Sequence, residues 1–335
     1  MNSIFEAMKL QRYSRDESIR LINQFGRTRS PFVFLISFSG EGNIVVPENE
    51  AARGGFNLDM PGLVNYKLGT VPGEAISFTK LPVNRDRYSK AFSLVKDQIL
   101  YGNSFLLNLT FPTRVKSNYS LEQIFRGSKA PFKLYLEDEL VVFSPERFVR
   151  IEGNTITSNP MKGTIDANIP GAQARLISDE KEDAEHNTIV DLIRNDLSIV
   201  ASGVKVERFK YIDRIRTHQG ELLQMSSEIS GVLPNDFYSR LGTVLFSLLP
   251  AGSISGAPKK RTVEIIRKAE AYERGYYTGI FGHWDGSRLD SAVAIRYIEK
   301  DGDKLIFKSG GGITFQSSCE HEYDEMVNKV YVPIY

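Results

Sequence analysis

Residues 131–158, PFKLYLEDELVVFSPERFVRIEGNTITS, contain short β-prone runs in direct succession. Turn signals at Glu137-Asp138 and Gly153-Asn154 join these runs in pairs, as in β-hairpins. Strands that follow one another without an intervening helix pair mostly antiparallel, unlike the strands of a β-α-β alternation. The stretch therefore predicts an α+β fold built on mostly antiparallel sheets. The four expected strands are 132–135, 139–143, 147–151 and 155–157.

The pattern outside this stretch agrees with an α+β fold. Apolar residues recur at helical spacing in several segments, and Asp285-Gly286 and Asp301-Gly302 indicate two more hairpins between 276 and 307. Residues 1–84 are richer in Gly, Pro and Asn, which predicts a short β-rich subdomain packed on a core formed by 85–335. The remaining expected elements are a strand within 31–38, helices over 86–101, 183–200, 258–272 and 319–330, and a strand over 104–115.

Composition excludes several classes of function. Forty-two Lys and Arg against forty-one Asp and Glu give a net charge of +1, which argues against a nucleic-acid or membrane-surface partner. Cys319 is the only cysteine, so no intramolecular disulfide or thiolate zinc cluster is expected. The first residues lack the apolar core of a signal peptide, and no apolar run is long enough to span a bilayer. We expect a soluble cytoplasmic protein.

Two pairs of glutamates are spaced three residues apart. Glu182 and Glu185 lie at the start of one predicted helix, and Glu322 and Glu325 lie on another. This spacing places both members of a pair on one helical face. If the helices converge, the carboxylates would repel one another without a cation, and Mg²⁺ accepts such oxygen ligands. Solvent-exposed helix faces carry the same pattern, so the spacing leaves both interpretations open.

Lys162 follows a predicted strand in the segment NPMKGT, 159–164. A lysine with the normal pKa of about 10.4 is almost entirely protonated at neutral pH, and the ammonium is no nucleophile. Burial would lower the pKa of Lys162, whereas neighbouring carboxylates would raise it. The sequence alone allows a solvated surface charge or a candidate nucleophile.

Two glycine-rich segments are candidates for binding an anion. Residues 309–312, SGGG, follow a predicted strand, and residues 252–259, GSISGAPK, lead into a predicted helix. Consecutive glycines allow backbone N–H groups to approach an anion, and a helix start favours negative charge. Taken in isolation, the two segments are better explained by a tight strand end and by ordinary capping by Ser255.

Taken together, these segments resemble the chorismate-utilising enzymes, a family of anthranilate, aminodeoxychorismate, isochorismate and salicylate synthases. The resemblance implies antiparallel β-sheets packed as a sandwich with helices on the outside, and a chorismate-binding catalytic domain over 85–335. IVDLIRNDL and GSISGAPK are its most specific motifs. The matching segments, in family order, are 144–148 (SPERF), 160–164 (PMKGT), 184–186 (AEH), 189–197 (IVDLIRNDL), 252–259 (GSISGAPK), Tyr277, Arg296, 310–312 (GGG), 324–325 (DE) and 328–329 (NK).

The resemblance also implies the roles of individual residues. Glu185 and Glu325 would hold Mg²⁺, with Glu182 and Glu322 supporting the site and the ring carboxylate of chorismate completing the metal shell. A dianionic substrate suits a divalent cation combined with a guanidinium and fixed N–H donors. The implied substrate-binding residues are Gly163, Thr164, Ser253, Tyr277, Arg296, Gly311, Gly312 and Lys329.

Within the family, Lys162 and Ser253 are similar to the aminodeoxychorismate synthases, since anthranilate synthases carry Ala and usually Thr at these positions. The implied catalytic residues are Lys162, whose amine attacks chorismate C2 as the C4 hydroxyl leaves, and Glu146, a general acid–base. Ammonia then adds at C4 and expels the lysine. The product, 4-amino-4-deoxychorismate, would pass to an aminodeoxychorismate lyase that makes 4-aminobenzoate for folate synthesis.

Two positions depart from the family pattern. Gln224 stands where the family has a pocket histidine, and Leu106 stands where isochorismate and salicylate synthases carry a water-activating lysine. Leucine cannot activate water, so isochorismate synthesis is not expected. The chain has no GxCxG nucleophile, and a glutamine amidotransferase subunit is the implied source of ammonia. The alternatives are an anthranilate synthase large subunit and a non-catalytic chorismate-binding subunit.

Overall fold

The computed structural model describes residues 10–67, 69, 73–178, 180–217 and 220–334. Within these ranges the strands form two nine-stranded sheets, called sheet I and sheet II below, and the strand pairs are antiparallel. No helix in the described ranges has the length and apolar character needed to cross a membrane. The predicted α+β class with antiparallel sheets is confirmed.

Sheet I contains the third and fourth strands of the 131–158 stretch. Its strands, in spatial order, are β11 (Met161–Asp166), β13 (Gly220–Val232), β10 (Thr155–Ser158), β9 (Arg147–Glu152), β16 (Arg288–Val293), β15 (Ile280–Trp284), β1 (Phe32–Ile36) and β2 (Ile44–Pro47), with β12 (Ser202–Thr217) paired to β13. The tight turn at Gly153, which has a φ of +60°, joins β9 to β10 as the sequence predicted.

Sheet II contains the first two strands of the stretch. Its strands are β14 (Gly256–Ala257), β6 (Leu106–Ser117), β18 (Lys304–Ile313), β17 (Tyr297–Asp301), β8 (Leu140–Ser144), β7 (Phe132–Leu136), β3 (Phe56–Met60) and β4 (Leu63–Val64), with β5 (Phe78–Leu81) paired to β6. The β7–β8 turn contains Asp138 in the left-handed region, at a φ of +56°. Strands from before residue 85 thus belong to both sheets, and the division at residue 84 stays a prediction.

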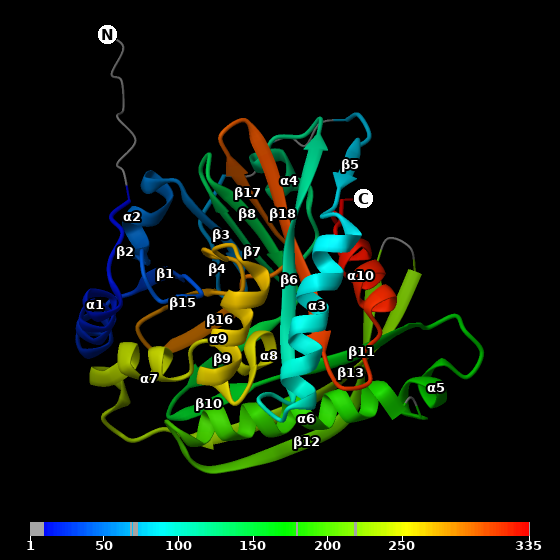
Figure 1. Cartoon of the computed structure of the whole chain (residues 1–335). Helices are drawn as coiled ribbons and strands as arrows, with labels where there is room; N and C mark the ends of the chain where they lie inside the picture. Colours follow the sequence, from blue (N-terminus) through cyan, green and yellow to red (C-terminus); the bar gives the residue numbers. More distant parts are fainter. Residues whose placement is uncertain (1–9, 68, 70–72, 179, 218–219, 335) are drawn as a thin grey trace.

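Helices cover the outer surfaces of the two sheets (Figure 1). In that view α3 and α10 lie beside β6, and α6 runs along the lower part of the molecule beside β12. The helical segments are α1 (Arg15–Thr28), α2 (Glu48–Ala51), η1 (Ala52–Gly54), α3 (Arg85–Leu100), α4 (Leu121–Gly127), α5 (Ala172–Ser178), α6 (Glu180–Ser198), η2 (Phe237–Arg240), α7 (Leu241–Ser247), α8 (Gly252–Ser255), α9 (Lys259–Glu270) and α10 (Cys319–Asn328).

The core is layered because side chains of a strand alternate between its two faces. In β1, Phe32 and Phe34 pack against helices α1, α6 and α7, whereas Val33 and Leu35 pack against sheet II. The far side of sheet II packs against α3, α9 and α10 in one cluster and against α4 in another. The predicted sandwich with external helices is confirmed.

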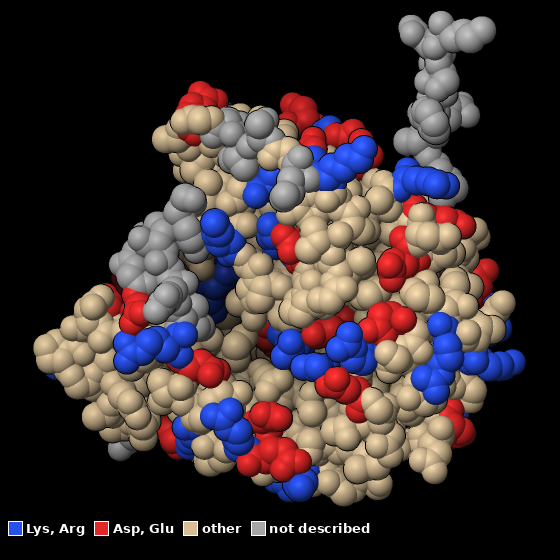
Figure 2. Space-filling model, turned by 180° about the vertical axis from the view of Figure 1, so that it is seen from behind, with Lys and Arg blue, Asp and Glu red and all other residues tan. Residues whose placement is uncertain are grey.

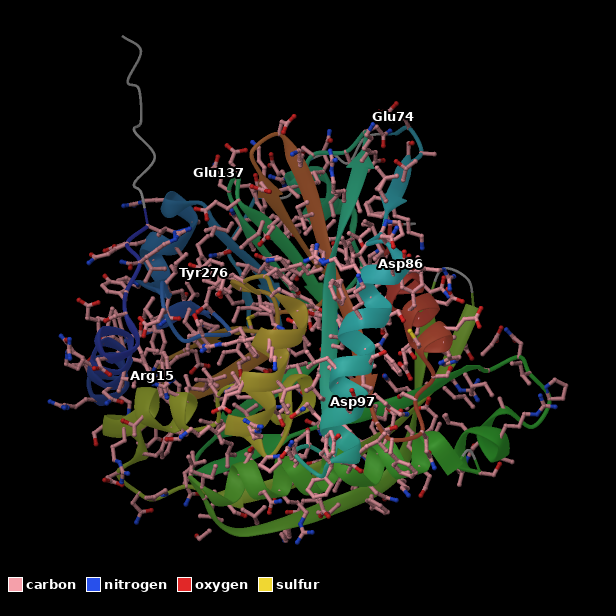
Figure 3. All side chains as sticks on the ribbon, in the orientation of Figure 1. Arg15, Glu74, Asp86, Asp97, Glu137 and Tyr276 are labelled. Atoms are coloured by element: carbon pink, nitrogen blue, oxygen red, sulfur yellow. The ribbon has the colours of Figure 1, made fainter. Side chains whose placement is uncertain are left out.

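Two helix starts show how local chemistry sets the boundaries. The side chain of Asn84 caps α3 by accepting a hydrogen bond of 2.7 Å from the Asp86 N–H, and Figure 3 shows Asp86 and Asp97 near opposite ends of that helix. Pro258, predicted in the first turn of a helix, is instead the extended residue that precedes α9. Its ψ of 136° is not helical, so α9 begins one residue later.

Candidate active site

The chain crosses from one sheet to the other twice at the same place. Pro145-Glu146 joins β8 in sheet II to β9 in sheet I, and residues 294–296 join β16 in sheet I to β17 in sheet II. The two crossovers are hydrogen-bonded at both ends, because Val293 N donates to Glu146 O and Phe143 N donates to Arg296 O, each over 3.1 Å. Glu146 and Arg296 are therefore fixed side by side where the sheets meet.

A cavity of about 310 Å³ opens at these crossovers. Seen from behind, the molecule shows a hollow in which Lys and Arg side chains gather (Figure 2). The cavity brings together every predicted site residue whose side chain the structure describes. They are Glu146, Lys162, Gly163, Glu182, Glu185, Ser253, Tyr277, Arg296, Gly311, Gly312, Glu322, Glu325 and Lys329. Thr164 lies on β11, but its side chain is outside the described part.

The environment of Glu146 disfavours the charged form of its carboxyl group. Burial disfavours its charged form and raises its pKa, although the hydrogen bond from Ser253 and the cations of Lys162 and Arg296 oppose the rise. The hydroxyl of Ser253, on α8, donates to Glu146 Oε1 over 2.7 Å. A carboxyl group that has a raised pKa and faces a cavity is suited to proton transfer.

Lys162 enters the cavity from β11, and its Nζ lies 3.1 Å from Glu185 Oε2. Burial disfavours the ammonium, but Glu185, Glu182 and Glu325 outweigh burial and raise the pKa of Lys162. Burial and neighbouring carboxylates were the two opposing effects that the sequence left open. The carboxylates have the larger effect on the pKa of Lys162. The amine therefore needs a change in this charge environment before it can act as a nucleophile.

Gly163 permits the backbone beside Lys162 to turn. Its φ is +71°, and the β11–β13 register shifts between Lys162 and Thr164. A Cβ at position 163 would lie 2.8 Å from Leu176 Cδ1 and 3.4 Å from Glu182 Oε2. The glycine thus lets α5 and α6 pack closely against the strand that carries Lys162.

The two glutamate pairs approach the cavity from α6 and α10. Glu185 pairs with Lys162, and Glu325 Oε1 lies 2.6 Å from Lys329 Nζ. Glu322 is buried and accepts a hydrogen bond of 2.8 Å from the Ser317 hydroxyl. All four carboxylates line one cavity, as the helical spacing allowed.

The oxygen-rich lining fits a hard divalent cation such as Mg²⁺, which prefers carboxylate ligands. One ligand atom from each of His321, Glu322 and Glu325 lies within 4.8 Å of the others. His321 directly precedes Glu322 in the sequence, but it was not predicted as a ligand because none of the four histidines has metal-ligand spacing with another. Metal binding itself stays a prediction.

The glycine-rich strand end lines the cavity next to the α10 carboxylates. Gly310, Gly311 and Gly312 belong to β18 and pair with residues of β6, so they are not a free loop. A Cβ at Gly311 would lie 3.4 Å from Glu322 Oε2, and one at Gly312 would lie 3.0 Å from Leu106 Cδ1 and 4.0 Å from Lys162 Nζ. Side chains at positions 311 and 312 would fill the space around Glu322 Oε2 and Lys162 Nζ.

Arg296, Lys329 and Tyr277 are cationic or hydrogen-bond-donating groups that line the cavity. No carboxylate in the described residues forms an ion pair with Arg296, whose backbone is left-handed at a φ of +54°. Burial lowers the pKa of Lys329 despite its contact with Glu325. Burial raises the pKa of Tyr277, so its hydroxyl stays protonated and can donate a hydrogen bond. These groups suit an anionic ligand.

Sequence reasoning missed three polar lining residues, Asn108, Thr278 and Lys308. Asn108 Oδ1 is buried without a hydrogen-bond partner in the described part of the chain. In the sequence, Asn108 stands between two apolar residues of a predicted strand. This pattern indicates a polar side chain that points inward. Lys308 is nearly buried and pairs with Glu299 over 2.7 Å, a contact that only the fold reveals.

Gln224 lines the cavity, whereas Leu106 lies buried behind Gly312.

Residues 54–334 match the model of a protein family described as chorismate binding enzyme. Because the match spans most of the chain, the protein belongs to this family and acts on chorismate. The resemblance found in the sequence is confirmed.

Individual relatives agree with the family. An uncharacterized PabA-like protein of Pasteurella multocida is 51% identical over 94% of this chain and 98% of its own length. Aminodeoxychorismate synthase component 1 of Bacillus subtilis is 32% identical over 78% of this chain, a match that spans 57% of that protein. A putative 2,3-dihydroxybenzoate-specific isochorismate synthase from Bacillus anthracis superposes with a TM-score of 0.73, at 21% identity, over 96% of this chain and 89% of that chain, and supports the fold alone.

Proposed function

We propose that the protein is an aminodeoxychorismate synthase component that converts chorismate and ammonia into 4-amino-4-deoxychorismate. The observation that carries the proposal is the position of Lys162, whose amine faces the cavity near Glu146 and the Gly312 backbone. The similarity to the Bacillus subtilis enzyme supports the same assignment. The product would then serve 4-aminobenzoate and folate synthesis through a lyase.

The first step joins Lys162 to the substrate. Its neutral amine attacks chorismate C2, the C1=C2 and C5=C6 double bonds shift to C1=C6 and C4=C5, and the C4 hydroxyl leaves as water with a proton from Glu146. Holding the amine against the ring makes the attack intramolecular, which removes much of the entropic cost. The raised pKa of Glu146 supports its role as the proton donor.

The second step releases the lysine. Ammonia attacks C4, the double bonds return to C1=C2 and C5=C6, the Lys162 amine leaves C2, and the proton lost by the attacking ammonia returns to Glu146. The sum of the steps is chorismate plus ammonia giving 4-amino-4-deoxychorismate plus water, with Lys162 and Glu146 regenerated. The ammonia comes from a glutamine amidotransferase partner or from free ammonium.

Substrate binding relies on charge. Arg296, Lys329 and Tyr277 would hold the carboxylates of chorismate, assisted by backbone groups of Gly311 and Gly312. Glu185 and Glu325, with Glu182 and Glu322 in support, would hold Mg²⁺, which supplies positive charge for a dianionic substrate. Withdrawing Glu185 from Lys162 would remove the main interaction that keeps the lysine protonated.

Product analysis tests the proposal. The purified chain is incubated with chorismate, Mg²⁺ and ammonium, and the products are identified by mass spectrometry. We expect an aminated product that retains the enolpyruvyl group, and its loss in Lys162→Ala. Lys205→Ala, which removes an exposed lysine on β12, is the matched control.

Intact-protein mass spectrometry tests the covalent step directly. With chorismate and Mg²⁺ but without ammonium, the protein should gain the mass of chorismate less one water, and Lys162→Ala should not. Formation of anthranilate and pyruvate, or full activity of Lys162→Ala, would contradict the proposal. The first outcome would instead identify an anthranilate synthase, consistent with a relative of that name in Spirochaeta aurantia at 31% identity.

A further inference from the structure

Arg274 is a buried cation directly behind the cavity. It lies between α9 and β15, is 2% exposed, and does not line the cavity. An arginine side chain has five N–H donors, and each of these has a described acceptor. Nε and one Nη2 donor bind Glu270, over 2.9 and 2.6 Å. The other Nη2 donor and the two Nη1 donors bind groups on three separate segments.

Those three segments all form walls of the cavity. Arg274 donates to Asn108 O on β6 over 2.7 Å, to Ile254 O on α8 over 3.1 Å and to Thr278 Oγ1 over 3.2 Å. Asn108, Ile254 and Thr278 line the cavity themselves. One rigid guanidinium therefore sets the spacing of three walls that are distant in the sequence.

The charge of Arg274 is neutralised without reaching the cavity. Glu270 is 1% exposed, and its Oε1 also accepts hydrogen bonds from Thr110 N and Thr110 Oγ1, over 2.8 and 2.9 Å. The pair is thus satisfied within the protein and anchored to β6. It has no remaining donor with which to bind a substrate, so its influence on the site must be geometric.

Thr278 shows why this geometry needs support. It has a φ of +60°, in the left-handed region that a β-branched residue rarely adopts. Its hydroxyl accepts from Arg274 and donates to Tyr277 O over 2.6 Å. Its N–H donates to Ala294 O over 2.8 Å, in the crossover that carries Arg296. The conformation of Thr278 thereby connects Arg274 to two predicted substrate-binding residues.

The contact to α8 connects Arg274 to the proposed proton donor. Ile254 O, held by Arg274, follows Ser253, whose hydroxyl binds Glu146. The other end of α8 is held separately, because Gly252 N donates to Asp196 Oδ2 over 3.2 Å. Arg274 therefore fixes one of the two ends of the short helix that positions Ser253.

We propose that Arg274 is a positioning residue for chorismate conversion: it holds Asn108, Ile254 and Thr278 in register so that Tyr277, Arg296 and Ser253 face the substrate together. It acts through these residues and does not contact the substrate. The inference rests on chorismate as the substrate, a property of the family, and is independent of which product the enzyme forms.

The test follows consumption of chorismate, whatever the product, by wild type and Arg274→Lys with Mg²⁺ and ammonium. Lysine keeps the charge but offers three donors, so the walls lose their common anchor. Because small displacements of reacting groups are costly, we expect kcat/KM per folded enzyme to fall by about 10- to 100-fold. Lys133→Met is the matched control, since it removes another buried cation, paired with Asp59 and outside the cavity.

A second pair of variants does not disturb the buried charge. Thr278→Val keeps the branched shape but loses the acceptor for Arg274, and Thr278→Ser keeps the hydroxyl. We expect kcat/KM to fall by about tenfold in Thr278→Val and to stay near wild type in Thr278→Ser. These variants keep the inference testable if Arg274→Lys does not fold.

A double-mutant cycle separates positioning from stability. Glycine adopts the left-handed conformation without support, so Arg274→Lys should cost less activity when Thr278 is replaced by Gly. The inference is overturned if kcat/KM of folded Arg274→Lys stays within about twofold of wild type, as expected for Lys133→Met. It is also overturned if Thr278→Val and Thr278→Ser have the same kcat/KM. If the wild-type enzyme forms a product other than 4-amino-4-deoxychorismate, the proposed function is revised. The comparison of chorismate consumption between wild type and variants still holds.

Discussion

The Ser253 hydroxyl lies 2.7 Å from Glu146 Oε1, although the two residues are 107 positions apart. The hydrogen bond joins α8 to the first crossover between the sheets. Because it stabilises the charged carboxylate, it opposes the rise in the Glu146 pKa caused by burial. The acidity of the proposed proton donor is therefore set from a neighbouring helix.

Ser253→Ala should extend activity to higher pH. A general acid works only while protonated, so activity falls as pH rises through the pKa of Glu146. Removing a hydrogen bond to the carboxylate raises that pKa, and the falling limb of kcat/KM against pH should move upward. Ser239→Ala, at a partly exposed site outside the cavity, should leave the profile unchanged. A downward shift in Ser253→Ala would contradict the proposed role of the bond.

Glu146→Gln should abolish most turnover while leaving chorismate binding. The amide keeps the shape of the side chain but cannot donate the proton that the leaving hydroxyl needs. General acid catalysis contributes about 10²- to 10⁴-fold, and kcat should fall by that amount. Steady-state kinetics and calorimetric titration with chorismate measure the two effects. Unchanged kcat would exclude Glu146 as the acid.

Glu185→Gln should lower the pKa of Lys162 in the metal-free protein. The carboxylate at 3.1 Å favours the ammonium, so its removal leaves burial to favour the neutral amine. An NMR titration of ¹³C-methylated lysines reports the shift. Glu264→Gln, which removes an exposed carboxylate on α9, serves as the control. A constant or raised pKa in Glu185→Gln would show that another charge dominates.

Substituting Glu325 with Ala should weaken binding of a divalent cation. Mn²⁺ titration followed by electron paramagnetic resonance measures affinity without relying on activity, and dialysis against EDTA should stop chorismate turnover. Glu137→Ala is the control, because Glu137 lies at the exposed β7–β8 turn, away from helices α6 and α10, which carry the predicted ligands (Figures 1 and 3). Full turnover after EDTA treatment would rule out a metal requirement.

Gly163→Ala should reduce both stability and activity. A Cβ there combines a left-handed backbone with a contact of 2.8 Å to Leu176, and the free energy of unfolding should fall by about 2–5 kcal/mol. Gly102→Ala isolates the backbone effect, since Gly102 has a φ of +75° with no atom near its Cβ, and it should cost about 1–2 kcal/mol. Urea denaturation compares the two, and equal losses would show that Leu176 moves freely.

The sequence predicted the parts of the fold whose signals are local. The β7–β8 and β9–β10 hairpins each carry a turn residue suited to a positive φ, and both were found at the expected positions. The β12–β13 hairpin was not predicted. Charged side chains interrupt the apolar residues of β12, and its register with β13 shifts at several points. The alternation of apolar and polar residues that marks a strand is therefore hard to recognise in the sequence.

The candidate site was predicted as a set of residues but not as an electrostatic arrangement. The sequence motifs included Lys162 and Glu185. The direction in which the pKa of Lys162 shifts depends on a distance between β11 and α6, which no local sequence pattern contains. Arg274 was not singled out, since one arginine after a helix resembles an ordinary surface charge. Its burial arises only when β6, α8 and α9 pack together.

The paired crossovers make the site intolerant of changes in chain length. Two residues separate β8 from β9, and three separate β16 from β17. One inserted residue would displace the following strand by about 3.3 Å and reverse which face its side chains occupy. Insertions at the β15–β16 or β17–β18 turns would leave those connections unaltered. Loop grafts and fusion points therefore belong at the hairpin tips, and the crossovers should be kept at their native lengths in any redesign of this enzyme.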